Sequence, residues 1–165
     1  MSIAENVARI RAEMEAAAIA CGRDPKSIQL CAATKMNDAD AVRQAIAAGV
    51  DCCGENRVQE LTAKQAENAY TGAPVHFIGH LQRNKVKYIV DKVDMIQSVD
   101  SIRLAEEIEK ECAKKNIIMP ILAEINVGYE ESKSGIAPML SHLETDWRDT
   151  PICIARSSWD HPFCF

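Results

Sequence analysis

Lys35 stands at a position that suits covalent chemistry. It ends the apolar run LCAAT, and Asn37 and Asp38, which are typical of a helix start, follow almost at once. A lysine in this place lies at the carboxyl end of a strand, where parallel α/β folds build their sites. A free amine there can attack an aldehyde and hold it as a Schiff base. The plain alternative is a solvent-facing lysine at a strand end, and position alone leaves both interpretations open.

Four further polar residues close later apolar runs in the same way. Asn56 follows VDCCGE, His80 follows PVHFIG, Ser98 lies near the end of VDMIQSVD, and Asn126 follows PILAEI. Because the carboxyl ends of parallel strands meet at one edge of a sheet, we expect these side chains to face a ligand together with Lys35. For Asn56, a helix cap is the alternative interpretation.

Two local patterns raise the question of bound ions. Lys133 lies in a small basic loop with Ser134 and Gly135, and loops of this kind can hold anions. His76 and His80 have the spacing of a helical metal pair, but the strand-like residues between them break that geometry. The loop is therefore a candidate for an anion contact, and we expect no metal site.

The elements that position these residues alternate along the chain. Ser2 and Glu5 form the pattern of a capping box, which predicts an amphipathic helix that ends before Gly22. A second helix is predicted over residues 38–48, and short apolar runs and helical stretches then alternate through about five repeats. Strands separated by single helices must pair in parallel through right-handed crossovers. The class is α/β, and a (β/α) barrel and an open doubly wound sheet remain as architectures, the second weakened by the lack of GxGxxG.

The composition excludes several classes of protein. The chain has 165 residues, which is the size of one domain, with 47% apolar and 26% charged residues. It contains no apolar run of the ~20 residues that a membrane span needs, and its first residues lack the apolar centre of a signal peptide, so we expect a cytoplasmic protein. The net charge of −5 argues against a nucleic-acid-binding footprint spread over the whole surface and leaves local basic patches open. Seven cysteines without a CxxC pair predict reduced thiols.

Five motifs together resemble one family. LCAATK, GENRVQE, HFIGHLQRNKVK, QSVDS and EINVGYEESKSG follow in this order, and over about residues 1–140 they closely resemble the YggS/PROSC family of pyridoxal phosphate homeostasis proteins. The resemblance implies a (β/α) TIM-type barrel of pyridoxal 5′-phosphate (PLP) fold-type III, like the N-terminal domain of alanine racemase. It implies that Lys35 is the Schiff-base lysine, that Asn56 borders the cofactor, and that Lys133 makes a second PLP contact.

The same resemblance implies a function. The family is thought to store, buffer or deliver PLP inside the cell without an established reaction of its own, which makes PLP the ligand and PLP-dependent enzymes the candidate clients. Two alternatives stay open: a PLP-dependent, racemase-like amino-acid enzyme, and an interaction module without a cofactor. Racemases of this fold take a second acid–base group from an added domain, for which this chain has no room.

The end of the sequence departs from the family. Residues 141–165 form an atypical tail, rich in tryptophan, phenylalanine and cysteine, with one possible short strand at PICIA. A complete barrel needs about 200 residues or more and usually holds phosphate in the loops after its seventh and eighth strands. We therefore expect an incomplete barrel of about five to six strand–helix units, with an exposed edge that favours self-association.

Overall fold

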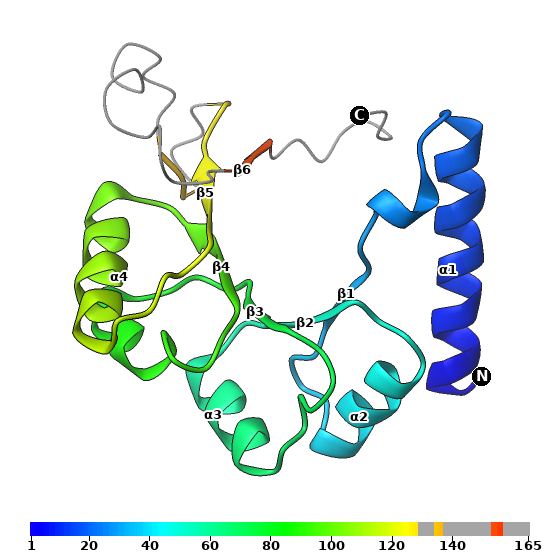
Figure 1. The fold of residues 1–165 in the computed structure, drawn as a ribbon, viewed down its shortest axis with the longest axis horizontal. Helices are drawn as coiled ribbons and strands as arrows, with labels where there is room; N and C mark the ends of the chain where they lie inside the picture. Colours follow the sequence, from blue (N-terminus) through cyan, green and yellow to red (C-terminus); the bar gives the residue numbers. More distant parts are fainter. Residues whose placement is uncertain (129–133, 137–152, 157–165) are drawn as a thin grey trace. The chain divides into compact units, whose positions relative to one another are not determined.

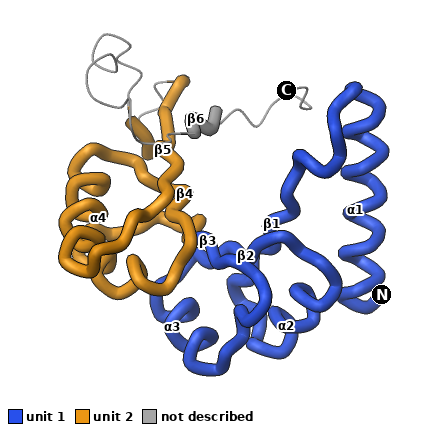
Figure 2. The backbone as a smooth tube through the Cα atoms, in the orientation of Figure 1, with its two compact units in different colours: residues 1–76, 162–165 blue, residues 77–161 orange. Residues whose placement is uncertain are grey.

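The computed structural model describes residues 1–128, 134–136 and 153–156 (Figure 1). These residues fall into two compact units, unit 1 ending at His76 and unit 2 starting at Phe77 (Figure 2). Within each unit, strands that are neighbours in the sheet are consecutive in the chain. Among the described residues, no helix combines the length and the apolar character needed to cross a membrane.

Unit 1 contains two parallel strands and the start of a third. Cys31 lies opposite Cys52 and Ala33 opposite Gly54, and the Cys53 amide donates to the Pro74 carbonyl at 2.9 Å, directly before the third strand. In chain order, the elements are α1 (Ile3–Ala20), η1 (Pro25–Ser27), β1 (Cys31–Ala33), α2 (Ala39–Ala47), β2 (Cys52–Glu55), α3 (Val58–Ala66) and β3 (Val75–Phe77), which ends in unit 2.

The helix starts of unit 1 follow the sequence signals. The Ser2 hydroxyl accepts from the Glu5 amide, and the Glu5 carboxylate accepts from the Ser2 amide, so the predicted capping box is confirmed. Asp38 caps α2 by accepting from the Ala41 amide at 2.8 Å. α1 and α2 lie side by side (Figure 1).

The core of unit 1 forms where the helices cover the strands. Both cysteines of β2 are buried, and so is every other residue of that strand. A strand buried along its whole length is typical of a parallel sheet covered by helices, because neither face meets water. The buried apolar residues are Val7, Ala18, Ala39, Val42, Val50, Cys52, Cys53, Leu61, Ala69, Tyr70 and Val75.

Unit 2 repeats the strand–helix alternation. After β3 come η2 (Arg83–Tyr88), β4 (Met95–Val99), α4 (Ile102–Lys115), β5 (Ile121–Ile125) and β6 (Cys153–Arg156). β4 pairs in parallel with β5, and β5 pairs in parallel with β6. The predicted α/β class and the short strand predicted at PICIA are therefore confirmed.

The helical segment between β3 and β4, η2, is a 3₁₀ helix, in which the Ile89 amide donates to the Val86 carbonyl at 3.0 Å. Val86 and Ile89 are both buried, and a spacing of three residues suits the three residues per turn of a 3₁₀ helix. Ser101 stands at the N-cap of α4, but its side chain makes no capping hydrogen bond.

Candidate functional site

Lys35 and Asn56 occupy matching positions at the carboxyl ends of neighbouring strands. Ala33 of β1 lies opposite Gly54 of β2, and each of the two candidate residues follows two positions later. The pairing continues beyond the strand, because the Thr34 amide donates to the Gly54 carbonyl at 2.9 Å. Lys35 is exposed and Asn56 is half-buried. Unit 1 therefore brings these two predicted site residues to one edge of its sheet, as the sequence indicated.

Lys35 lies in a turn with an unusual backbone. The residue after it, Met36, has a φ of 62°, in the left-handed region that residues with a side chain rarely adopt. Asn37 closes the turn, since its amide donates to the Thr34 carbonyl at 3.2 Å and its side-chain Nδ2 donates to the Lys35 carbonyl at 3.1 Å. The Met36 amide donates to Oε2 of Glu60, in α3, at 2.9 Å.

A buried ion pair lies directly behind this turn. Lys64 Nζ of α3 donates to Glu55 Oε1 at 2.5 Å and to the Thr34 carbonyl at 2.7 Å, and it reaches Glu60 Oε2 at 3.5 Å. The Thr34 hydroxyl donates to the same Glu55 oxygen at 2.7 Å. The side chains of Lys64 and Glu55 are 8% and 0% exposed. Burying two charges is costly unless each finds several partners, and here both do.

Burial, together with this ion pair, shifts the pKa values of two neighbouring side chains. The buried hydroxyl of Tyr70 faces Thr34 and Glu55 without a hydrogen bond of good geometry. Burial, and then the Glu55 carboxylate, raise the pKa of Tyr70 far above its usual value. Burial, and then Cys52 and Glu55, raise the pKa of the Cys53 thiol to about 11, although the Lys64 ammonium acts in the opposite direction. Both groups therefore stay protonated at neutral pH.

Asn56 carries an unused polar atom. Its Oδ1 is buried and has no hydrogen-bond partner within the described residues. The cap interpretation was wrong, because the N-cap of α3 is Arg57 and no side chain caps it. An unsatisfied buried polar atom costs about 1–3 kcal/mol, so native structures keep few of them. A hydrogen-bond donor that reached this oxygen would remove that cost.

His80 and Ser98 lie together in unit 2, at the ends of β3 and β4. His80 is exposed, and its Nδ1 lies 3.2 Å from Oδ2 of Asp100. Ser98 is buried, and its hydroxyl donates to the carbonyl of Gly79, the residue before His80. These contacts hold the carboxyl ends of the two strands to each other.

Asn126 directly follows β5 and is half-buried. Its amide donates to the Ile136 carbonyl at 3.0 Å, which brings residues 134–136 against the strand end. Gly135 has a φ of 120°, and a Cβ there would lie 2.8 Å from the Asn126 nitrogen, so only glycine fits. Lys133, the predicted second PLP contact, lies outside the described residues.

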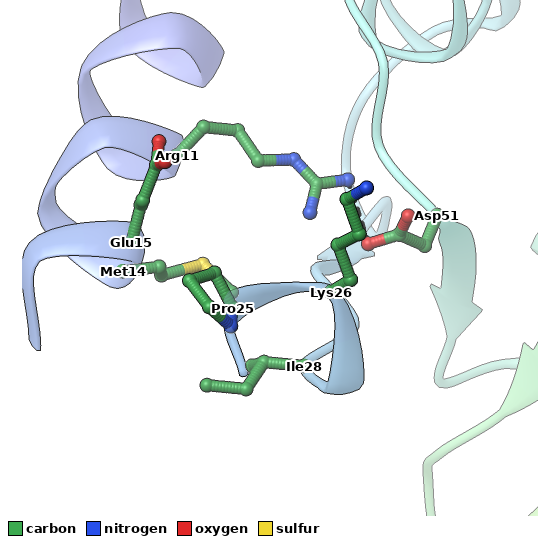
Figure 3. A pocket seen from close by; sticks show the side chains of 7 residues that line it. All are labelled: Arg11, Met14, Glu15, Pro25, Lys26, Ile28 and Asp51. Carbon is green, nitrogen blue, oxygen red and sulfur yellow. Dashed lines mark hydrogen bonds and ion pairs between the residues drawn. The ribbon is translucent and has the colours of Figure 1, made fainter. Parts of the chain in front are cut away.

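A surface pocket lies at the opposite end of unit 1 (Figure 3). Arg11 crosses from α1 to the residues before β2, where it donates to Asp51 Oδ2 and to the Gly49 carbonyl, both at 2.6 Å. Asp51 Oδ2 also accepts from the Leu30 amide, at 2.5 Å. The pocket therefore opens at the amino ends of β1 and β2, away from Lys35. Its lining consists of Arg11, Met14, Glu15, Pro25, Lys26, Ile28 and Asp51.

Metal binding finds no support in the part of the chain that is described. There, no three His, Cys, Asp or Glu side chains gather where they could hold an ion. His76 belongs to β3 and His80 follows that strand, so the two do not share a helix face.

Glu60, Lys64 and Tyr70 were missed by the sequence analysis. Glu60 and Lys64 are four residues apart, which is the spacing of an ordinary surface ion pair on a helix. One signal could have identified Lys64: it lies three residues after the buried Leu61 and so shares the covered face of α3. A lysine on that face needs a buried acid, and Glu55 at the end of an apolar strand is a ready candidate.

Known proteins resemble this chain in sequence and in structure. Residues 2–149 match the family model for the alanine racemase N-terminal domain. The pyridoxal phosphate homeostasis protein of Pseudomonas aeruginosa is 40% identical over 137 residues, which are 83% of this chain and 60% of that protein. The structure of PipY from Synechococcus elongatus with PLP bound is 35% identical, with a TM-score of 0.69 over 83% of this chain and 59% of PipY.

More distant relatives show the fold alone. Alanine racemase from Streptomyces coelicolor is 20% identical, with a TM-score of 0.52 over 80% of this chain and 34% of that enzyme. The predicted TIM-type barrel fold is confirmed by these matches, and the six strands of the described residues are fewer than the eight of a complete barrel. The chain spans about three fifths of the length of the curated relatives it matches.

Proposed function

Because this chain belongs to the alanine racemase N-terminal domain family, we propose that it binds PLP covalently through Lys35 and serves PLP homeostasis. The Lys35 amine adds to the aldehyde carbon, a C=N bond replaces C=O, and water leaves. The reaction is reversible, so the protein can store the reactive aldehyde and release it. The observation that carries the proposal is the exposed Lys35 amine at the carboxyl end of β1, in register with Asn56.

The residues around Lys35 fit such a ligand. The buried Oδ1 of Asn56 lacks a partner within the described residues, and as an acceptor it would be satisfied by a hydrogen-bond donor of the cofactor. When bound, PLP supplies an aldehyde and a phosphate. The chain supplies the amine, and the turn at Met36 sets the direction of the backbone that carries it. Two kinds of relative support the same reading, one named for PLP homeostasis and one solved with PLP.

A carrier explains the neighbourhood of Lys35 better than an enzyme does. The basic and acidic groups behind the turn are occupied, since Lys64 and Glu55 neutralise each other and Tyr70 is buried with a raised pKa. A racemase-like enzyme needs a free acid–base group near the bound amino acid. We therefore rank the enzyme second, and turnover of an amino acid that Lys35→Ala abolishes would reverse this order.

The proposal extends to location and partners. We place the protein in the cytoplasm, where thiols stay reduced, and the described cysteines, at positions 21, 31, 52, 53 and 112, form no disulfide with one another. Enzymes that use PLP are the proposed clients. His80, Ser98 and Asn126 remain predictions from their places at strand ends, and Lys133 remains a prediction from the family resemblance. An alanine variant of each, measured for PLP affinity, tests them one by one. Residues 1–140 remain the proposed PLP-binding portion, with 141–165 as a separate tail.

The test is the visible spectrum of the purified chain titrated with PLP. We expect an imine absorbance band in the wild type and no band in Lys35→Ala or Lys35→Arg, because neither substitution leaves an amine that condenses with the aldehyde. Lys26→Ala is the matched control, since Lys26 is also exposed but lies at the pocket before β1. A band that survives in Lys35→Ala, or one that is missing from the wild type, would contradict the proposal. A stable protein complex formed without any band would favour the cofactor-free interaction module.

A further inference from the structure

The turn that carries Lys35 does not hold its shape by itself. Met36 has a side chain and a positive φ, a conformation that costs free energy and persists only where the surroundings enforce it. Glycine would adopt this φ at little cost, yet the chain has methionine here, and this residue is 87% exposed. Burial of Met36 therefore does not stabilise the turn, and polar contacts to the backbone must do so.

Those contacts come from α3, on both sides of Lys35. On one side, the Met36 amide donates to Glu60 Oε2 at 2.9 Å. On the other, the Thr34 carbonyl accepts from Lys64 Nζ at 2.7 Å. Because both peptide groups flanking Lys35 are bonded to one helix, the Cα of Lys35 has little freedom to move relative to α3.

Glu60 contacts both the Met36 amide and Lys64, so it links the two contacts that hold the turn. Its Oε2 accepts from Met36 and lies 3.5 Å from Lys64 Nζ, and its Oε1 lies 3.6 Å from Arg57. The carboxylate is thus held by two cations while it holds the backbone amide. Its side chain is 24% exposed, so the contact is neither lost in bulk water nor fully buried.

We infer that Glu60 is a positioning residue for Lys35, which fixes the left-handed turn through the Met36 amide so that the Lys35 amine is presented in one orientation. This inference rests on the proposed PLP chemistry for its consequence, because orientation of a reacting group contributes to the ease of the reaction. Glu60 itself does not contact the reacting atoms in this account.

The experiment compares Glu60→Ala and Glu60→Gln with the wild type by titration with PLP. Alanine removes the acceptor for the Met36 amide, whereas glutamine keeps an oxygen in the same place. We expect Glu60→Ala to weaken apparent PLP affinity by about tenfold or more, and Glu60→Gln to stay within about threefold of the wild type. Glu67→Ala is the matched control, since Glu67 is an exposed acid just after the end of α3. Thermal melting of each variant checks that it is folded.

The outcomes separate this inference from the proposed function. Affinity of a folded Glu60→Ala within about threefold of the wild type would overturn the inference, and so would equal losses in Glu60→Ala and Glu60→Gln. If the wild type gives no imine band, the proposed function fails. Amide hydrogen exchange at Met36 then tests whether Glu60 anchors the turn, independently of PLP binding. The Met36 amide should exchange faster in Glu60→Ala than in the wild type or in Glu67→Ala, and equal exchange would refute the anchoring role.

Discussion

The two ends of β1 and β2 use the same kind of contact under opposite conditions. At the amino ends, Arg11 and Asp51 form an ion pair whose side chains are 33% and 35% exposed. At the carboxyl ends, Lys64 and Glu55 form one whose side chains are 8% and 0% exposed. The exposed pair keeps much of its hydration, whereas the buried pair gives it up and depends on its hydrogen bonds.

The two ion pairs also differ in the backbone and polar groups that surround them. The Asp51 carboxylate also accepts from the Leu30 amide, so this ion pair is tied to the backbone before β1. Beside the buried pair stand a left-handed Met36 and an Asn56 oxygen without a partner in the described residues. Strain and unsatisfied polar atoms collect where a protein does chemistry, because stability alone would remove them. The difference agrees with the proposal that PLP binds at the carboxyl ends, and it assigns the amino ends a role in stability.

The largest expected effect comes from breaking the buried pair. Lys64→Met leaves the Glu55 carboxylate buried without its cation, which should lower the free energy of unfolding by about 3–5 kcal/mol in urea denaturation. The double variant Lys64→Met/Glu55→Gln removes the stranded charge as well and should be more stable than Lys64→Met alone. A double variant that is less stable than the single one would show that the charge on Glu55 is not the source of the loss.

Breaking the contact at the amino ends should cost less and leave binding intact. Asp51→Ala removes the acceptor of the Leu30 amide and the partner of Arg11, and we expect a loss of about 1–2 kcal/mol in the same denaturation experiment. The PLP affinity of the folded variant should match the wild type. A clear loss of affinity would show that the amino ends of the strands also contribute to PLP binding.

Acid should weaken the Glu60 anchor. The hydrogen bond from the Met36 amide, and then the nearby Lys64 ammonium, hold the pKa of Glu60 below its usual value of 4.5. A carboxyl group with a lowered folded-state pKa contributes stability that is present above its unfolded pKa and is lost as the pH falls through its folded pKa. From pH 5 downward, the melting temperature of the wild type should therefore fall more steeply than that of Glu60→Gln. Parallel pH profiles would contradict the assignment.

The smallest effect is expected at Tyr70. Its buried hydroxyl makes no hydrogen bond of good geometry, so Tyr70→Phe removes a polar atom that contributes little. Replacement by a residue of the same shape should change the free energy of unfolding by less than about 1 kcal/mol. A larger loss would reveal that the hydroxyl supports Glu55 in solution, and double-mutant analysis with Glu55→Gln would measure that coupling.

Local sequence signals predicted the elements of the fold, because those signals act over a few residues. The capping box at Ser2 and the cap at Asp38 mark helix starts, and apolar runs mark strands whose ends position Lys35 and Asn56. The network behind the turn could not be predicted in the same way. Thr34 follows β1, Glu55 ends β2 and Lys64 lies in α3, and the sequence does not say which lysine of a helix will lie against which carboxylate. The left-handed φ of Met36 had no signal at all, since glycine or asparagine would be the usual residue there.

The engagement of Lys64 has a consequence for selectivity among amines. An ammonium group has three protons, and Lys64 directs its own toward three oxygens, those of Thr34, Glu55 and Glu60. To attack any electrophile, this nitrogen would have to lose a proton and abandon a buried carboxylate. Lys64 is therefore shielded from glycation, acylation and adventitious aldehydes, although it lies just behind the turn that exposes Lys35. Lys64 and Lys35 thus differ in reactivity, because the Lys64 ammonium is held by three oxygens whereas Lys35 is exposed to solvent.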